Sequence, residues 1–261
     1  MTLSEATAAV IFLTGFFFFL SGTELFLLSH RASFVNVWSD RNLRRDFHEG
    51  LPLPRFLTDL LFSRRSFRFL ALTEALAAVG LIVWPGFGWL VVLFVLHLMI
   101  CIRFRGTFNG GSDMMAFVVL TGLLIAQAIG DENGRKLGLA YIALHAGYSY
   151  LKAGIVKLAQ RDWRSGEALP VFLKRSLLST AVRAGFFLEK RRKLSRFLGW
   201  LTMFFEASVV GLLFFPEGRW PYMVLALGFH FGNFVLFGLN RFFWIWLAAW
   251  PALLYALSIL R

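Results

Sequence analysis

The chain has 261 residues, of which 58% are hydrophobic and 31 are phenylalanine, a composition that sets it apart from soluble domains and predicts a polytopic membrane protein. The formal net charge of +12 fits loop lysines and arginines that fix membrane topology better than it fits nucleic-acid binding. The single cysteine, Cys101, excludes an intrachain disulfide and a cysteine-based metal centre, and we expect no metal site.

Eight apolar stretches are long enough, or nearly so, to cross a hydrocarbon core as helices of about 20 residues. Turn-forming sequences rich in glycine, proline and asparagine separate them. Because a helix satisfies its own backbone in lipid, we predict an all-α fold, a polytopic membrane helical bundle of about eight transmembrane helices in a single domain, 1–261. The predicted spans are 4–28, 67–84, 89–104, 114–130, 137–158, 198–215, 221–238 and 242–260.

The positive charges gather in segments that fall on one side of this eight-span arrangement. Segment 29–66 holds seven arginines, and 159–197 holds ten lysines and arginines. Basic loops of membrane proteins stay in the cytoplasm, so we expect both segments to be cytoplasmic and both chain termini to face outward. The mixture of basic and apolar side chains in 181–197 fits either an interfacial helix among anionic headgroups or a solvated loop.

Ionisable side chains at bilayer depth are costly, so they tend to face a cavity and to have a function. Glu206 and His230 lie near the centres of their predicted spans. Glu206 is either a paired structural carboxylate or a functional acid, and His97 fits a hydrogen-bonded core residue. The candidates are Glu24, Glu74, His97, His145, Lys152, Lys157, Glu206 and His230.

The fifth predicted helix carries a polar stripe on one face. Its members at i, i+4, i+7 and i+11 are Tyr141, His145, Tyr148 and Lys152. Such a stripe fits either a cavity for an amphipathic ring compound or hydrogen bonds between helices. Lys157 is rotated well away from Lys152, and near its helix end it either extends to the interface or points into another crevice.

Polar residues also share a face in the seventh span, where His230, Asn233 and Phe237 follow i, i+3, i+7 spacing. Two polar groups in register favour a site more than one does.

The sequence Asn-Gly-Gly-Ser-Asp at 109–113 precedes the fourth span. Ser112 or Asp113 is a natural N-cap, which predicts a helix start after a tight turn. In the other interpretation, Asn109 and free backbone N–H groups form a pocket for a ligand oxygen.

Three of these segments together resemble motifs of one family. Ala153-Gly-Ile-Val-Lys157, followed by Asp162-Trp163 and Gly166, resembles the lysine motif of the vitamin K-dependent γ-glutamyl carboxylases and their bacterial relatives, the HTTM-domain proteins. Phe229-His-Phe-Gly-Asn233 resembles that family's later histidine segment, and 108–113 resembles its asparagine-containing helix entrance.

The resemblance implies a role for each of these segments. In the carboxylases the matching lysine deprotonates a lipid hydroquinone, which reacts with oxygen to give a base strong enough to remove a C–H proton so that CO₂ can add. A lysine can be a base near neutral pH only where burial disfavours its ammonium form. By resemblance, Lys157 and His230 are the catalytic residues. With the polar residues above, the expected cofactor-binding set is Asn109, Gly110, Gly111, Asp113, His145, Tyr148, Lys152, Glu206 and Asn233, and the expected supports of the lysine helix end are Asp162, Trp163 and Gly166.

The leading hypothesis is a vitamin K-dependent carboxylase-like enzyme of the bacterial cytoplasmic membrane that uses a reduced lipid quinone and oxygen, with CO₂ as a further co-substrate. Its expected partners are membrane lipids, the quinone, and a peptide substrate or a separate substrate-recognition protein, with no nucleic acid. The alternative is a non-catalytic quinone- or lipid-binding subunit that assists peptide maturation, export or immunity. A transporter has less support because no inverted repeat is visible.

Overall fold

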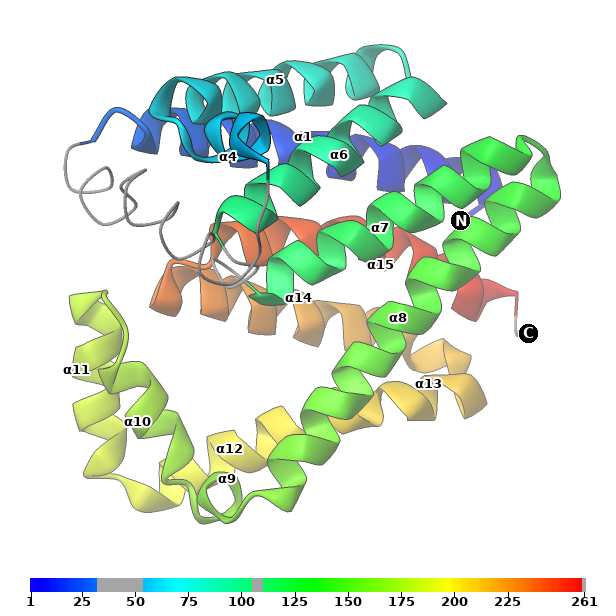
Figure 1. Cartoon of the computed structure of the whole chain (residues 1–261). Helices are drawn as coiled ribbons and strands as arrows, with labels where there is room; N and C mark the ends of the chain where they lie inside the picture. The colour runs from blue at the N-terminus through cyan, green and yellow to red at the C-terminus, as the bar shows by residue number, and fades with distance from the viewer. Residues whose placement is uncertain (32–53, 105–109, 260–261) are drawn as a thin grey trace. The chain divides into compact units, whose positions relative to one another are not determined.

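The computed structural model describes residues 1–31, 54–104 and 110–259 (Figure 1). Within these ranges the chain forms helices and no β-strand. The helices belong to two compact units, which we call unit 1 (Met1–Thr7 with Leu139–Arg261) and unit 2 (Ala8–Gly138). The predicted all-α helical fold is confirmed.

Helices occupy all eight predicted spans: α1 (Leu3–Leu28), α5 (Arg64–Val83), α6 (Phe87–Arg103), α7 (Gly110–Ile129), α8 (Glu132–Ala159), α12 (Arg192–Ala207), α14 (Arg219–Phe237) and α15 (Asn240–Ser258). Six helical segments of the described chain are long and apolar enough to cross a membrane: Leu3–Leu28, Arg65–Val83, Gly111–Ile129, Arg192–Phe214, Pro216–Phe237 and Asn240–Ser258. Helix α6 is shorter, with 17 residues, and α8 is interrupted by charged side chains. The protein is therefore a membrane protein with at least these six candidate spans.

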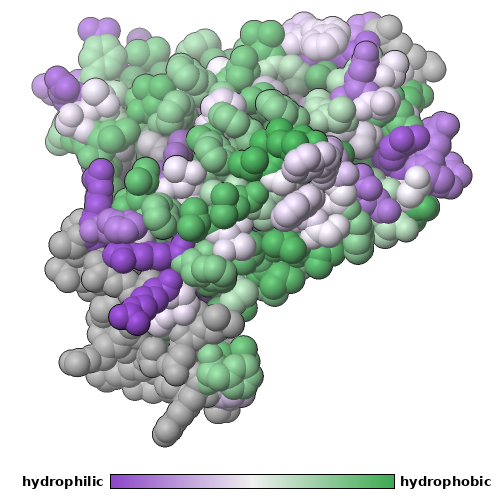
Figure 2. All heavy atoms as spheres, turned by 90° about the horizontal axis from the view of Figure 1, so that it is seen from above, coloured by the Kyte–Doolittle hydropathy of each residue, from purple (hydrophilic) through white to green (hydrophobic). Residues whose placement is uncertain are grey.

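The surface of α5 shows why the helices suit lipid. An exposed apolar stripe runs along it at helical spacing through Phe69, Leu72, Leu76, Val79 and Val83. Figure 2 shows hydrophobic side chains over much of the face drawn there. In water such a continuous stripe would leave apolar area exposed, whereas a bilayer covers it.

Shorter helices fill the basic segments. Helix α4 (Arg55–Phe62) lies in the first, of which residues 32–53 are outside the described part. The second holds α9 (Arg161–Ser165), α10 (Ala168–Lys174) and α11 (Ser179–Glu189). Helices α10 and α11 form a hairpin with Leu173, Ala181 and Leu188 at its centre, packed against apolar residues of α12 and α14. The hairpin covers the ends of two helices that carry candidate site residues.

Helix α7 begins earlier than the capping pattern predicts. Its first residue is Gly110, so Ser112 and Asp113 lie in the first turn and neither is the N-cap. The first-turn amides need no partner inside the helix, so the glycines can join it at little cost. An acidic residue in this turn, Asp113, also interacts favourably with the positive end of the helix dipole.

Candidate functional site

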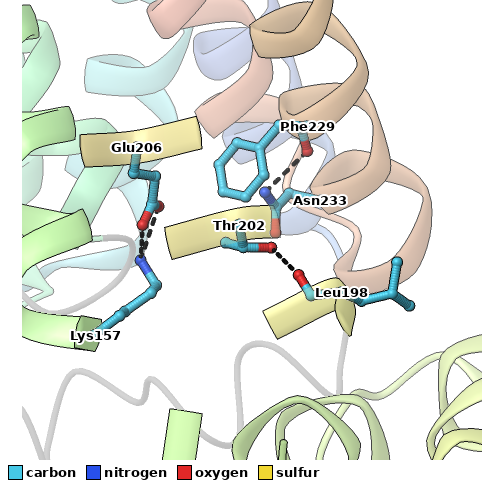
Figure 3. Close-up of polar contacts among 6 residues, drawn as sticks. All are labelled: Lys157, Leu198, Thr202, Glu206, Phe229 and Asn233. Atoms are coloured by element: carbon cyan, nitrogen blue, oxygen red, sulfur yellow. Dashed lines mark hydrogen bonds and ion pairs between the residues drawn. The ribbon is translucent and has the colours of Figure 1, made fainter. Parts of the chain in front are cut away.

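Lys157, near the end of α8, is bound to a carboxylate inside unit 1. Its Nζ lies 2.7 Å from Oε1 and 2.6 Å from Oε2 of Glu206 on α12. The side chains are 21% and 4% exposed. Figure 3 shows the two residues pointing toward one another from their helices. Lys157 therefore points into the protein rather than out to the headgroups, and Glu206 is paired.

A glycine in the lysine motif brings the two helices together. Gly154, one turn before Lys157, packs so closely on α12 that a Cβ there would lie 2.6 Å from the backbone nitrogen of Ala207. Ala207 immediately follows Glu206. Only glycine allows α8 this close, and the approach lets a lysine three residues later reach the carboxylate.

The end of α8 is closed by the residues that follow Lys157. The ring of Trp163 lies 5.4 Å from the Lys157 ammonium, within the range of a cation–π contact. Arg164 donates from one guanidinium nitrogen to the carbonyls of Leu158 (2.7 Å) and Ala159 (3.3 Å), which the helix leaves without partners. Trp163 thus contacts the lysine itself, its expected role in fixing the helix end stays a prediction, and Arg164 is a cap that sequence reasoning missed. Asp162 is exposed in the first turn of α9.

Gly166 holds α9 against the start of α12. Its φ of +81° is in the left-handed region, and a Cβ there would meet the backbone of Arg196 at 2.5 Å. The buried Ser195 hydroxyl donates to the Gly166 carbonyl at 2.6 Å. Both the backbone conformation and the close packing require glycine here.

His230, on α14, lies in a chain of hydrogen bonds. Its Nε2 is 2.7 Å from the Tyr150 hydroxyl, and Trp250 Nε1 donates to that hydroxyl at 3.3 Å. The Tyr150 proton has no other acceptor in the described part of the chain, so we assign it to His230 Nε2. A neutral imidazole then carries its own proton on Nδ1.

Around His230, unit 1 buries polar atoms that no described residue satisfies. They are His230 Nδ1, Tyr222 Oη and Trp246 Nε1. The indole ring of Trp246 is stacked on His230 at a centroid distance of 5.0 Å, and Tyr222 contacts Tyr150 edge-on at 5.9 Å. Buried donors nearly always have a partner, so the oxygen of a ligand or a buried water would complete them.

The lysine pair and the histidine cluster belong to one site. Tyr150 and Lys157 are seven residues apart on α8 and share a face. Phe205, which directly precedes Glu206 on α12, contacts the rings of Tyr150 at 5.8 Å and Tyr222 at 5.1 Å between centroids. We define the unit 1 site as Lys157, Glu206, Tyr150, Tyr222, His230 and Trp246. Sequence reasoning missed Tyr150, Tyr222 and Trp246, although Tyr150 could have been found from its spacing to Lys157.

Asn233 lies at the edge of this site. Its amide donates back to the Phe229 carbonyl of its own helix at 3.0 Å. Figure 3 draws it beside Thr202, which is one turn before Glu206 on α12 and donates to the Leu198 carbonyl at 3.0 Å. The Asn233 carbonyl oxygen has no partner in the described structure and is only partly buried, so it remains available to a ligand.

The predicted stripe on α8 is turned toward the surface of unit 1. Tyr148 and Lys152 are exposed and contact each other, with the ammonium 5.9 Å from the ring. Tyr141 and His145 are partly buried, with ring centroids 4.5 Å apart. The stripe does not join the unit 1 site.

The asparagine segment belongs to unit 2. Asn109 lies outside the described residues, Gly110 and Gly111 begin α7, and Asp113 is buried. The binding of a quinone oxygen by these residues stays a prediction.

Unit 2 buries a second polar cluster around His97. Its Nδ1 lies 3.8 Å from Glu74 Oε1, and both side chains are 0% exposed. Its Nε2 is 3.2 Å from the Asp113 carbonyl and 3.6 Å from Cys101 Sγ. Possible ligand atoms of His97, Cys101 and Asp113 lie within 4.8 Å of one another, a grouping that the single cysteine did not predict. The hydrogen bonds fit the expected core histidine.

Comparison with known proteins adds one finding. The family model of the HTTM domain matches residues 127–256. The matched stretch contains the whole of α8 and continues into α15, so it includes every residue of the unit 1 site. No curated protein and no solved structure matches the chain.

Proposed function

Because the chain belongs to the HTTM-domain family, the domain family of vitamin K-dependent carboxylase-like proteins, we propose that it is a membrane enzyme that uses a reduced lipid quinone and oxygen to modify a peptide or small molecule. The observation that carries the proposal is the partly buried Lys157–Glu206 pair beside aromatic residues with unsatisfied donors. A basic group, aromatic walls and free donors are what a ring with oxygen substituents requires.

The residues of the unit 1 site fit such a ring. Tyr150, Tyr222 and Trp246 supply aromatic surface, and His230 Nδ1 is a buried donor for a ring oxygen. The predicted role of Asn109, which lies outside the described residues, rests on the family resemblance alone. When bound, a reduced quinone supplies the reducing equivalents for reaction with oxygen and, from that reaction, a base able to remove a C–H proton. CO₂ is the proposed further co-substrate of a carboxylation.

Lys157 and Glu206 would move the proton. In the structure the Lys157 ammonium donates to both carboxylate oxygens of Glu206. An ammonium group cannot accept another proton. Transfer of one proton from Nζ to Oε of Glu206 breaks an N–H bond, forms an O–H bond and leaves a neutral pair. The free amine can then take a proton from an acidic hydroxyl, which breaks that O–H bond, forms an N–H bond and leaves an oxyanion, while Glu206 keeps the proton that Lys157 gave up.

The test is oxygen consumption by the purified protein with reduced vitamin K as the probe. We expect turnover that depends on the quinone and is lost in Lys157→Ala. Turnover equal to that of the wild type in Lys157→Ala would remove the lysine from the mechanism.

The tight ion pair between Lys157 and Glu206 also supports the second candidate, a non-catalytic quinone- or lipid-binding subunit that assists peptide maturation, export or immunity. A permanently paired ammonium holds structure and does no proton transfer. Full biological function in both Lys157→Ala and His230→Ala would favour this role. Either function fits the proposed location in the bacterial cytoplasmic membrane, with the basic segments 29–66 and 159–197 cytoplasmic and both termini outside.

A further inference from the structure

A second site lies next to the lysine helix, where α9 meets the beginning of α12. A pocket of about 450 Å³ is lined there by five basic side chains and a serine: Arg161, Arg164, Ser165, Arg192, Lys193 and Arg196. The Gly166 contact with Arg196 and the Ser195 hydrogen bond fix the two helices at this point. The packing of the chain, and not chance side-chain placement, therefore brings the five cations together.

The charges of this pocket are largely unmatched. Arg192 pairs with Glu167 at the rim, and Arg164 donates to backbone carbonyls of α8. Within the described ranges no carboxylate pairs with Arg161, Lys193 or Arg196. Five like charges around one hollow repel each other, so an anion with several oxygens would stabilise the arrangement. Guanidinium groups bind phosphate oxygens in a bidentate manner.

The position of the pocket favours a membrane lipid as the source of such a phosphate group. Three of the lining residues, Arg192, Lys193 and Arg196, lie within the first turns of the candidate span Arg192–Phe214. The pocket therefore lies at the headgroup level of that span. On the same face of α12, Lys193 is followed at helical spacing by Phe197, Leu201 and Phe204, all exposed. A cationic hollow that continues into an apolar strip matches a lipid with an anionic headgroup.

We propose that this pocket binds the phosphate headgroup of an anionic membrane phospholipid, with an acyl chain along the strip formed by Phe197, Leu201 and Phe204. The site is separate from the quinone proposal and stands without it. It adjoins the lysine helix through Arg164, which lines the pocket and also caps α8. A bound phosphate would hold Arg164 at that helix end.

The experiment measures lipid binding to the purified full chain in detergent by native mass spectrometry. The probes are dioctanoyl phosphatidylglycerol, dioctanoyl phosphatidylcholine and inorganic phosphate. We expect one phosphatidylglycerol to bind in preference to phosphatidylcholine and to resist displacement by inorganic phosphate. Equal binding of the two lipids, or displacement by inorganic phosphate at similar concentration, would overturn the proposal. This comparison uses the wild-type protein and does not depend on any variant folding.

Variants then locate the site. The triple variant R161Q/K193Q/R196Q should weaken phosphatidylglycerol binding on the order of a hundredfold, since each basic residue near a headgroup contributes about fivefold. The matched control R175Q/R183Q/K190Q removes the same charge from exposed positions outside the pocket and should bind as the wild type does. An equal loss in both variants would mean general charge attraction and no defined site.

Discussion

The two units of the protein bury an ionisable pair each, and the pairs differ in access and geometry. In unit 1, Lys157 contacts both oxygens of Glu206 at 2.6 to 2.7 Å and keeps 21% of its side chain exposed. In unit 2, His97 and Glu74 are 3.8 Å apart and fully buried. A pair with partial access can exchange a proton with a ligand directly, whereas a fully buried pair can do so only after the surrounding structure opens.

The side chains that surround the two pairs also differ. His97 has backbone and thiol neighbours at Nε2, and the rings of Phe18 and Phe117 pack against it. Near the lysine pair, His230 Nδ1, Tyr222 Oη and Trp246 Nε1 have no partner among the described residues. In unit 2 the unsatisfied atoms belong to the pair itself, His97 Nδ1 and both carboxylate oxygens of Glu74, whereas in unit 1 they lie on aromatic and histidine side chains beside a hydrogen-bonded pair. We expect changes in unit 1 to affect turnover and changes in unit 2 to affect stability.

The largest expected effect is the loss of turnover on removal of the lysine amine. Lys157→Met should lower quinone-dependent oxygen consumption by roughly 10²- to 10⁴-fold, the usual range for a general base. The matched control is Lys136→Met on the same helix, where the exposed ammonium pairs with Glu132. That variant should turn over at the wild-type rate. A similar loss in both variants would contradict the comparison.

The next effect is on stability. Lys157→Met leaves Glu206 buried without its counter-charge, which costs about 3–5 kcal/mol for a pair of this kind. Thermal unfolding in detergent should show the loss. Replacing both residues, in Lys157→Met/Glu206→Met, removes the unpaired charge and should recover most of the stability. If the double variant were less stable than the single one, the carboxylate would not be the source of the cost.

A substitution in the lysine motif should break the pair indirectly. Gly154→Val places a side chain against the Ala207 backbone, so α8 must move from α12 at a cost of about 1–3 kcal/mol. Turnover should fall with it, because Lys157 no longer reaches Glu206. In the control Gly147→Ala the new Cβ meets no atom within 4 Å. The control should keep turnover and gain helix stability, as measured by thermal unfolding.

The fully buried pair of unit 2 should give a smaller and different result. His97→Gln removes the ring that contacts Glu74 and the Asp113 carbonyl, and should lower the free energy of unfolding by about 1–3 kcal/mol. Turnover per folded molecule should not change. Oxygen consumption normalised to the folded fraction distinguishes the two units, and a selective loss of turnover would place a functional site in unit 2.

The smallest effect concerns the surface of α8. The hydrogen bond from Lys136 holds the pKa of Glu132 below its ordinary value. A carboxyl group whose pKa is lowered in the folded state stabilises the fold at pH values above its ordinary pKa. This contribution is lost as the pH falls through the folded-state pKa. Both groups are exposed, so thermal unfolding of Lys136→Met and the wild type should be nearly identical at neutral pH.

The sequence predicts the helices well, because the need to satisfy backbone groups in lipid leaves little choice. It also identifies Glu206 and His230 as costly polar groups at bilayer depth, and the family resemblance singles out Lys157. It does not pair them, since the partner of each depends on how distant helices pack. In a chain this rich in aromatics, nothing marked Tyr222 or Trp246 as members of a site.

Glycines show the same limit. The motif contains Gly154, but its role is visible only once Ala207 of α12 lies against it. The N-cap assigned to Ser112 or Asp113 was wrong because glycine can also begin a helix. Local patterns predict elements, and contacts between elements decide the site.

The central claim is that the Lys157–Glu206 pair transfers a proton during turnover. The most direct measurement is quinone-dependent oxygen consumption by Lys157→Met/Glu206→Met, with the melting temperature recorded on the same sample. A folded double variant with near-wild-type melting and background oxygen consumption is the predicted result. Wild-type oxygen consumption by that folded variant would contradict the claim.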